Sequence, residues 1–366
     1  MALIDGRAAL GSLNRAEVGR GRRIFEDLIA KDDGNPTHHV GLANACVLQY
    51  EATRGEASPD RDALERAVCH AREAVRRAPN LAEARITLGF VLDRAGQRLE
   101  ALASLQRGLD LEPDNWRHQI RAAAVMWGDD RLRAARRALE LWPALALAHF
   151  LAASVFVARD ALALAEREID LALAAIADSA TPTLRFSSVA VWWLKGLLCL
   201  ARGATDEALA AFERELAQEA LGHIYSRECA AQVWYAKGVC AHRRGDTSAA
   251  RAAFGEALAR VPRLPMAHAA LAIVEGRTSP FTWPGPGPAP IEVVLAQAAL
   301  LKAGGHEADA AALGARSLEE APAGNGGWLL PIDPLLSVQA HKDVWTPALM
   351  TLRARAGTWT RPDPRC

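Results

Sequence analysis

The amino-acid sequence predicts an all-α protein built from stacked helix pairs, and three observations carry that prediction. The chain has 366 residues, of which 51% are hydrophobic and 23% are charged, so it can bury a sizeable core. No long stretch alternates apolar and polar residues, which is the pattern of a half-buried strand. Small and aromatic residues recur with a period of about 34 residues, and such a period is typical of helix-turn-helix repeats.

The recurring pattern is clearest in three stretches. The first contains Leu88, Gly89, Gly96, Ala101, Leu105 and Pro113. The second contains Trp192, Gly196, Gly203, Ala208 and Phe212, and the third contains Trp234, Gly238, Gly245, Ala250, Phe254, Ala257 and Pro262. A glycine inside a helix costs about 1 kcal/mol relative to alanine, so the first glycine of each set indicates close approach of a partner helix. The second glycine suits a turn, because glycine adopts the left-handed conformation without a Cβ clash.

These residues resemble the tetratricopeptide repeat (TPR) family, in which helix pairs stack side by side. The resemblance is strongest over Ala82–Pro113 and Ala231–Pro262, and it is also good over Val189–Leu216. Degenerate units are expected over Thr37–Pro79, Trp116–Pro143, Leu145–Asp178 and Glu292–Pro322. The resemblance implies a right-handed α-solenoid of TPR helix-turn-helix repeats with a C-terminal helical cap.

The chain is expected to divide into four segments. These are an N-terminal capping helix (1–36), the TPR array (37–276), a linker rich in proline and glycine (277–290), and a degenerate TPR hairpin with a C-terminal cap (291–366). The prolines of the linker favour an extended, semi-rigid crossing. The cap should cover the last exposed face of the core, with Trp328–Pro331 tucked against it, a break near Pro347 and frayed residues from Thr358 to Cys366.

Charge and hydropathy argue against two classes of partner. The 43 basic and 43 acidic residues give a net charge of +0, so no global field attracts phosphate backbones, and we expect no nucleic-acid partner. No segment approaches eighteen uninterrupted apolar residues, and the first ten residues lack the pattern of a signal peptide. We therefore expect no membrane partner and a cytoplasmic location.

The sequence contains no motif that indicates catalysis, and we expect neither enzymatic activity nor a metal or other cofactor. The six cysteines show no two-residue spacing of the kind that zinc or iron–sulfur sites use, so reduced, buried thiols are expected. The pair His38 and His39 does not complete a metal coordination sphere. Nucleophile-elbow and phosphate-loop motifs are absent.

The TPR resemblance implies that the first helices of successive units line a concave groove. Positions at helical spacing on those helices would project one stripe of side chains into the groove. The candidate partner-binding residues are Phe90, Asp93, Arg94, Trp127, His149, Phe156, Trp193, Tyr235, His242 and Arg243. Aromatic and arginine side chains contribute strongly to interface energy. The groove is therefore predicted to bind through apolar anchors with a basic rim.

The sequence leaves two questions open. Phe90, Phe156 and Trp193 fit core packing as well as a groove, because apolar stripes at helical spacing also pack between units. Lys and Asn fill the positions of Ile86, Phe90, Trp193 and Tyr235 in TPR domains that hold chaperone tails, so that specificity is not implied here.

The favoured function is a scaffold or adaptor that binds a partner protein or peptide in the groove. One alternative is a ligand-sensing regulatory module that binds a small molecule there. Another is an unrecognised enzyme that uses His149, His242 or a thiol.

Overall fold

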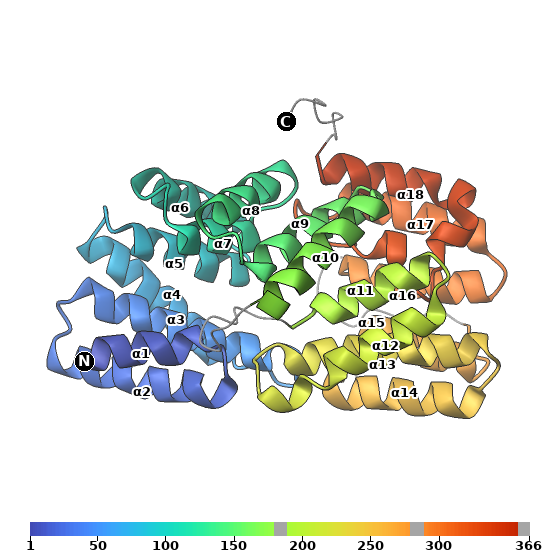
Figure 1. Cartoon of the computed structure of the whole chain (residues 1–366), viewed down its shortest axis with the longest axis horizontal. Coiled ribbons are helices and arrows are strands. Elements are labelled where there is room, and N and C mark those ends of the chain that lie inside the picture. Colours follow the sequence, from blue (N-terminus) through green and yellow to red (C-terminus); the bar gives the residue numbers. More distant parts are fainter. Residues whose placement is uncertain (179–188, 279–288, 358–366) are drawn as a thin grey trace.

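The computed structural model describes residues 1–178, 189–278 and 289–357. Over these ranges the chain forms eighteen α-helices, and the only β-structure described is an isolated bridge between Asn14 and His223. Figure 1 shows α9 and α10 near the middle of the molecule, with α1–α8 on one side and the later helices on the other. The fold is therefore an all-helical repeat solenoid.

Consecutive helices pack as antiparallel pairs in the amino-terminal half. Their bounds are α1 Ala2–Gly11, α2 Arg15–Lys31, α3 Pro36–Thr53, α4 Arg61–Arg77, α5 Ala82–Arg94, α6 Arg98–Leu111, α7 Trp116–Val125, α8 Asp129–Leu141, α9 Ala146–Ala158 and α10 Leu162–Asp178. The sequence predicted one capping helix within residues 1–36. The structure instead has a complete pair there, α1 and α2, which packs on α3.

The carboxyl-terminal half continues the series and ends in a helix. Its helices are α11 Val191–Ala201, α12 Thr205–Leu216, α13 Ser226–Arg243, α14 Thr247–Arg260, α15 Pro265–Val274, α16 Ile291–Ala303, α17 Glu307–Glu320 and α18 Lys342–Arg355. Pro347 lies inside α18 rather than at a break. The linker residues 279–288 and the tail from Thr358 lie outside the described residues.

The turns form as the glycine spacing predicts. Gly245 has a φ of 77°, and the N–H of Asp246 donates to the carbonyl of Ala241 at 3.0 Å, which ends α13. The Asp246 carboxylate then accepts the N–H of Ala249 at 2.9 Å and begins α14. One short segment therefore ends one helix and starts the next.

The glycines inside the helices allow close packing within a pair. A Cβ atom on Gly238 would lie 2.4 Å from the ring of Phe254, and one on Gly196 would lie 2.3 Å from the ring of Phe212. Gly89 meets Leu105 in the same way, at 2.5 Å. The sequence prediction of close helix approach at these positions is confirmed.

The array curls until distant parts of the chain meet. The loop between α12 and α13 reaches the first helix pair, where the N–H of Arg15 donates to the carbonyl of Gly222 and the N–H of Ile224 donates to that of Leu13, both at 2.9 Å. At the other end α18 contacts α9. The guanidinium of Arg159 there donates to the carbonyl of Ala356 at 3.0 Å. These two closures tie the loop before α13 to the first helix pair and the end of α18 to α9.

The glycine packing gives a direct test. Gly238→Ala should lower the free energy of unfolding by about 1–3 kcal/mol, because the new methyl group overlaps Phe254. The matched control is Gly255→Ala in α14, where a Cβ has no atom within 4 Å, so helix propensity should raise stability by up to about 1 kcal/mol. Denaturant unfolding followed by circular dichroism measures both. Equal effects of the two changes would contradict the packing explanation.

Candidate functional site

The inner face of the carboxyl-terminal half is covered by a segment of the chain itself. This segment, Trp328–His341, is here called the inner strap, and it is mostly irregular, with short 3-10 turns at Leu330–Ile332 and Val338–His341. Leu330 and Leu336 are fully buried, and the ring of Trp328 packs edge-on against that of Trp193 with centroids 6.3 Å apart. Its first turn contacts both α9 and α11. The strap is therefore part of the core.

Polar side chains of α13 and α16 hold the strap in place. The hydroxyl of Tyr235 donates to the carboxylate of Asp333 at 3.1 Å. The guanidinium of Arg243 donates to the carbonyl of Pro334 and, at 2.7 Å, to the hydroxyl of Ser337. The ammonium of Lys302 donates to the carbonyl of Leu336. These contacts recognise main-chain carbonyls and one carboxylate.

Asp333 organises the bend of the strap. One of its carboxylate oxygens accepts the N–H groups of Leu335 and Leu336, each at 2.9 Å. Burial raises the pKa of Asp333 to about 6, although these N–H groups and Tyr235 act in the opposite direction. A fraction of the Asp333 side chains is therefore protonated just below neutral pH.

The structure places four predicted groove residues against the strap or within the core beside it. Phe156, Trp193 and Tyr235 are only 5%, 7% and 2% exposed, and Arg243 holds the strap. His149 pairs with Glu168 at 2.7 Å, and His242 is half-buried near the end of α13. The first helices do line the inner face, but here the chain fills that face itself.

The other four predicted residues lie in the amino-terminal half. The ring of Phe90 has the guanidinium groups of Arg94 and Arg121 at 4.5 Å from its centroid, and Phe90 is only 6% exposed. Asp93 forms ion pairs with Arg94 and Arg98 at 2.6 and 2.7 Å. Trp127 lies under the guanidinium of Arg131 at 4.6 Å. Arginines therefore dominate this inner face.

A buried glutamate ties this half to the loop before α13. Glu51 has no exposed side-chain surface, and it accepts hydrogen bonds from Arg94 at 3.0 Å, Arg54 at 3.2 Å and the Tyr225 hydroxyl at 2.6 Å. Burial acts to raise the pKa of Glu51, but the two guanidinium groups and Tyr225 outweigh it and lower the pKa below its usual value. Arg54 also pairs with Glu228 at 2.6 Å. Glu51 thus stays ionised while it is buried.

Sequence reasoning missed Arg121, although a signal was available. Phe90 lies five residues after Arg85, just as the stripe positions of the other clear repeats lie one and five residues after the marker tryptophans Trp192 and Trp234. The same offsets from Trp116 give Arg117 and Arg121. The candidate residue from this degenerate repeat was instead Trp127, which packs against Arg131.

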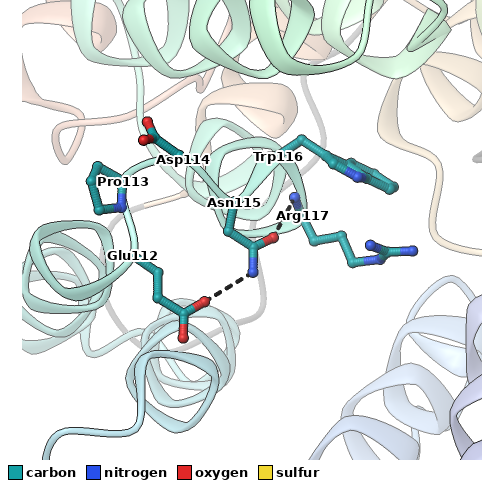
Figure 2. Close-up of a pocket in the computed structure, with 6 residues that line it drawn as sticks. All are labelled: Glu112, Pro113, Asp114, Asn115, Trp116 and Arg117. Carbon is teal, nitrogen blue, oxygen red and sulfur yellow. Dashed lines mark hydrogen bonds between the residues drawn. The ribbon is translucent and has the colours of Figure 1, made fainter.

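The two surface pockets have fewer features of a binding site than the inner face has. Figure 2 shows one at the start of α7, formed by the consecutive residues Glu112–Arg117. Asn115 accepts the N–H of Arg117 at 3.1 Å and donates to Glu112 at 3.0 Å, so its amide caps the helix. A second pocket includes Asp160, whose carboxylate is bound by Gln339 and Lys342 at 2.8 and 2.5 Å. Neither pocket supports the small-molecule alternative.

Three features of the described residues bear on other functions. They contain no group of three or more His, Cys, Asp or Glu side chains placed to hold a metal ion. Their five cysteines are all free. None of their helices has the length and apolar character needed to span a bilayer.

Replacing Glu51 tests the tie between the two distant parts of the chain. Glu51→Gln should lower the free energy of unfolding by about 3 kcal/mol, because it leaves two guanidinium groups without their buried counter-charge. Glu17→Gln is the control, since Glu17 also pairs with an arginine but is accessible to water, and its loss should cost much less than the loss of Glu51. Urea unfolding measures both values. Similar losses would argue against a special role for Glu51.

The raised pKa of Asp333 predicts a pH dependence. Between about pH 4 and pH 6 the folded chain retains a proton that the unfolded chain has released, so the contribution of Asp333 to stability falls as the pH rises through this window. Asp333→Asn removes this contribution. The difference in unfolding free energy between wild type and variant should therefore decrease from pH 4 to pH 6.5. A difference that is constant over this range would contradict the assignment.

Comparisons with known proteins identify the fold family. No family model matches the chain, and no curated protein matches it. Among solved structures, human IFIT1 with PPP-AAAA aligns with a TM-score of 0.56 and 15% identity over 85% of this chain and 69% of that one. Cut9 in the APC/C hetero-tetramer Cut9-Hcn1 aligns with a TM-score of 0.53 and 13% identity over 72% of this chain, which spans only 47% of the Cut9 chain. Both are TPR proteins, and at such identities the likeness concerns the fold. The chain therefore has the fold of the tetratricopeptide repeat proteins.

Proposed function

We propose that this protein is a non-catalytic scaffold that binds a partner protein or peptide on the inner face of its amino-terminal half, formed by α3, α5 and α7. The observation that carries this proposal is the inner strap. In the carboxyl-terminal half, the inner face holds an irregular chain segment through contacts from Tyr235, Arg243 and Lys302. The same kind of surface in the other half is suited to a segment of another protein.

The fold comparison supports the general role and leaves the partner open. The Cut9 structure was solved in a hetero-tetramer with Hcn1, so an array of this fold can serve in protein assembly. Two features of this chain favour the amino-terminal half. Its inner face carries Phe90, Arg94 and Arg121 close together. The inner face of the carboxyl-terminal half is already covered by residues as buried as Leu330 and Leu336.

These observations reduce the number of candidate binding residues. We propose that Arg94, supported by the nearly buried ring of Phe90, lies at the centre of the partner site, with Trp127 and Asp93 at its edge, where Asp93 orients Arg94 and Arg98. Arg117 and Arg121 join them from α7. The predicted residues of the later repeats, from His149 to Arg243, serve the fold.

Site-specific photo-crosslinking tests this placement. A photo-reactive amino acid replaces Arg117, an exposed arginine that stacks on Trp116 with 4.4 Å between guanidinium and ring centroid. The matched control replaces Arg214, which is also exposed and stacks on Trp192 at 4.4 Å in the other half. In native extract, position 117 should give a discrete crosslinked protein that position 214 does not give. Crosslinks from position 214 alone would contradict the proposed face.

A further inference from the structure

The amino-terminal inner face carries more positive than negative charge. Five arginines lie within electrostatic reach of one another on this face and its edge, namely Arg54, Arg94, Arg98, Arg121 and Arg131. The carboxylates that pair with members of this group are Glu51, Asp93 and Glu228. Glu83 also lies near Arg121, but its carboxylate forms an ion pair with Arg7 at 2.6 Å. Two of the five guanidinium groups thus have no carboxylate partner.

One of these two is satisfied by the main chain. The guanidinium of Arg131 donates to the carbonyls of Ala123 and Met126, each at 2.9 Å, and to the hydroxyl of Ser154 at 2.9 Å. Arg131 therefore has a structural role at the start of α8. Only Arg121 remains without such partners.

Arg121 forms no hydrogen bond and no ion pair with any residue that the structure describes. Its side chain is half-buried on α7, and its contact is with the ring of Phe90, 4.5 Å from the guanidinium carbon. Burial lowers the pKa of Arg121 to about 10, and the nearby carboxylate of Glu83, which is paired with Arg7, does not offset this effect. A half-buried charge without a bonded partner is unfavourable, and an anion at this position would compensate it.

We propose that Arg121 receives a carboxylate of an acidic partner peptide, from an aspartate or glutamate side chain or from its C-terminus. The planar guanidinium donates two parallel N–H bonds to a carboxylate, which suits this partner class. Phe90 holds the guanidinium from one side and leaves its N–H groups for the guest. This inference rests on the proposed function and specifies its partner.

A carboxylate fits this face better than a nucleic acid does. Glu51 and Asp93 already neutralise the neighbouring arginines on this face, so the one unpaired guanidinium matches a single carboxylate rather than the successive phosphates of a polyanionic backbone. Phe90 is already in contact with two guanidinium groups, so its ring is not open for stacking on a base. IFIT1, which shares the fold, was solved with PPP-AAAA, so an RNA oligonucleotide is a necessary arm of the test.

The experiment selects peptides from a displayed random library of twelve-residue sequences on the intact protein. Wild type should enrich peptides that share an Asp, a Glu or a free C-terminal carboxylate at one position. Arg121→Gln should lose this enrichment, and Arg214→Gln should keep it, since Arg214 stacks on Trp192 far from the site. Enrichment of peptides without a shared acid would overturn the inference but leave the proposed function standing. Enrichment of no peptide would overturn both.

A double-mutant cycle then tests the contact itself. An enriched peptide is resynthesised with Gln in place of its shared acid, or with an amidated C-terminus, and the affinities of both peptides are measured for wild type and Arg121→Gln. Loss of the charge-assisted pair should weaken binding by about tenfold to a hundredfold in wild type and change it little in the variant. The peptide change needs no protein variant, so a folding defect of Arg121→Gln cannot mask the result. Equal losses in both proteins would overturn the contact.

The RNA arm uses 5′-triphosphorylated tetra-adenylate. The proposal predicts no Arg121-dependent binding of this oligonucleotide at concentrations where the enriched peptide saturates the protein. Binding that Arg121→Gln abolishes would overturn the assignment in favour of a nucleic-acid guest.

Discussion

Burial of the inner strap is the interaction on which the carboxyl-terminal half depends. Helix pairs that stack in a row leave the inner sides of their first helices exposed, and here those sides carry Phe156 and Trp193. The strap covers them with Leu330, Leu336 and Val338. Each fully buried side chain of this kind stabilises the fold by about 2 kcal/mol. A segment with several of them belongs to the cooperative core, and its departure would unfold this half.

The inner faces of the two halves therefore carry different kinds of side chains. The carboxyl-terminal half covers its inner face with apolar side chains of the strap and binds the strap through its carbonyls. The amino-terminal half places charges there, and Glu51 compensates two of the guanidinium groups while it links α3 to Tyr225, 174 residues further along the chain. Arg121 is left outside this compensation. The inner face of the amino-terminal half thus carries a guanidinium group, that of Arg121, that has no paired anion, while the strap covers the other inner face with apolar side chains.

The sequence was sufficient for the features that depend on neighbours within one repeat. Gly238 predicted the approach of α14 because a mid-helix glycine needs a packing reason, and Phe254 supplies that reason at the expected distance. The turn at Gly245 also followed from local signals, since Gly245 has a φ of 77° and α14 starts two residues later.

Repeat patterns in the sequence could not predict the contacts between distant segments. Nothing in the local sequence around Glu51 indicates Tyr225, and the irregular strap has no helical period that would place Asp333 beside Tyr235. The curvature of the array decides these meetings, and it is the sum of small rotations between successive repeats. For this reason nine of the ten predicted groove residues lie on the expected helices, with Trp127 between α7 and α8, while the contact of four of them with the strap and the core beside it could not be foreseen.

Hydrogen exchange of the strap amides, followed by mass spectrometry on the native protein, tests the central claim most directly. The N–H groups of Leu330 and Ile332 donate to the carbonyls of Gly327 and Leu329 at 2.9 Å, and that of Leu336 donates to Asp333. If the strap is core, these amides exchange only as slowly as those in the middle of α11 and α13, through global unfolding. Exchange of the strap at the rate of the exposed turns, with α11 and α13 still protected, would show that it detaches on its own and would contradict the account.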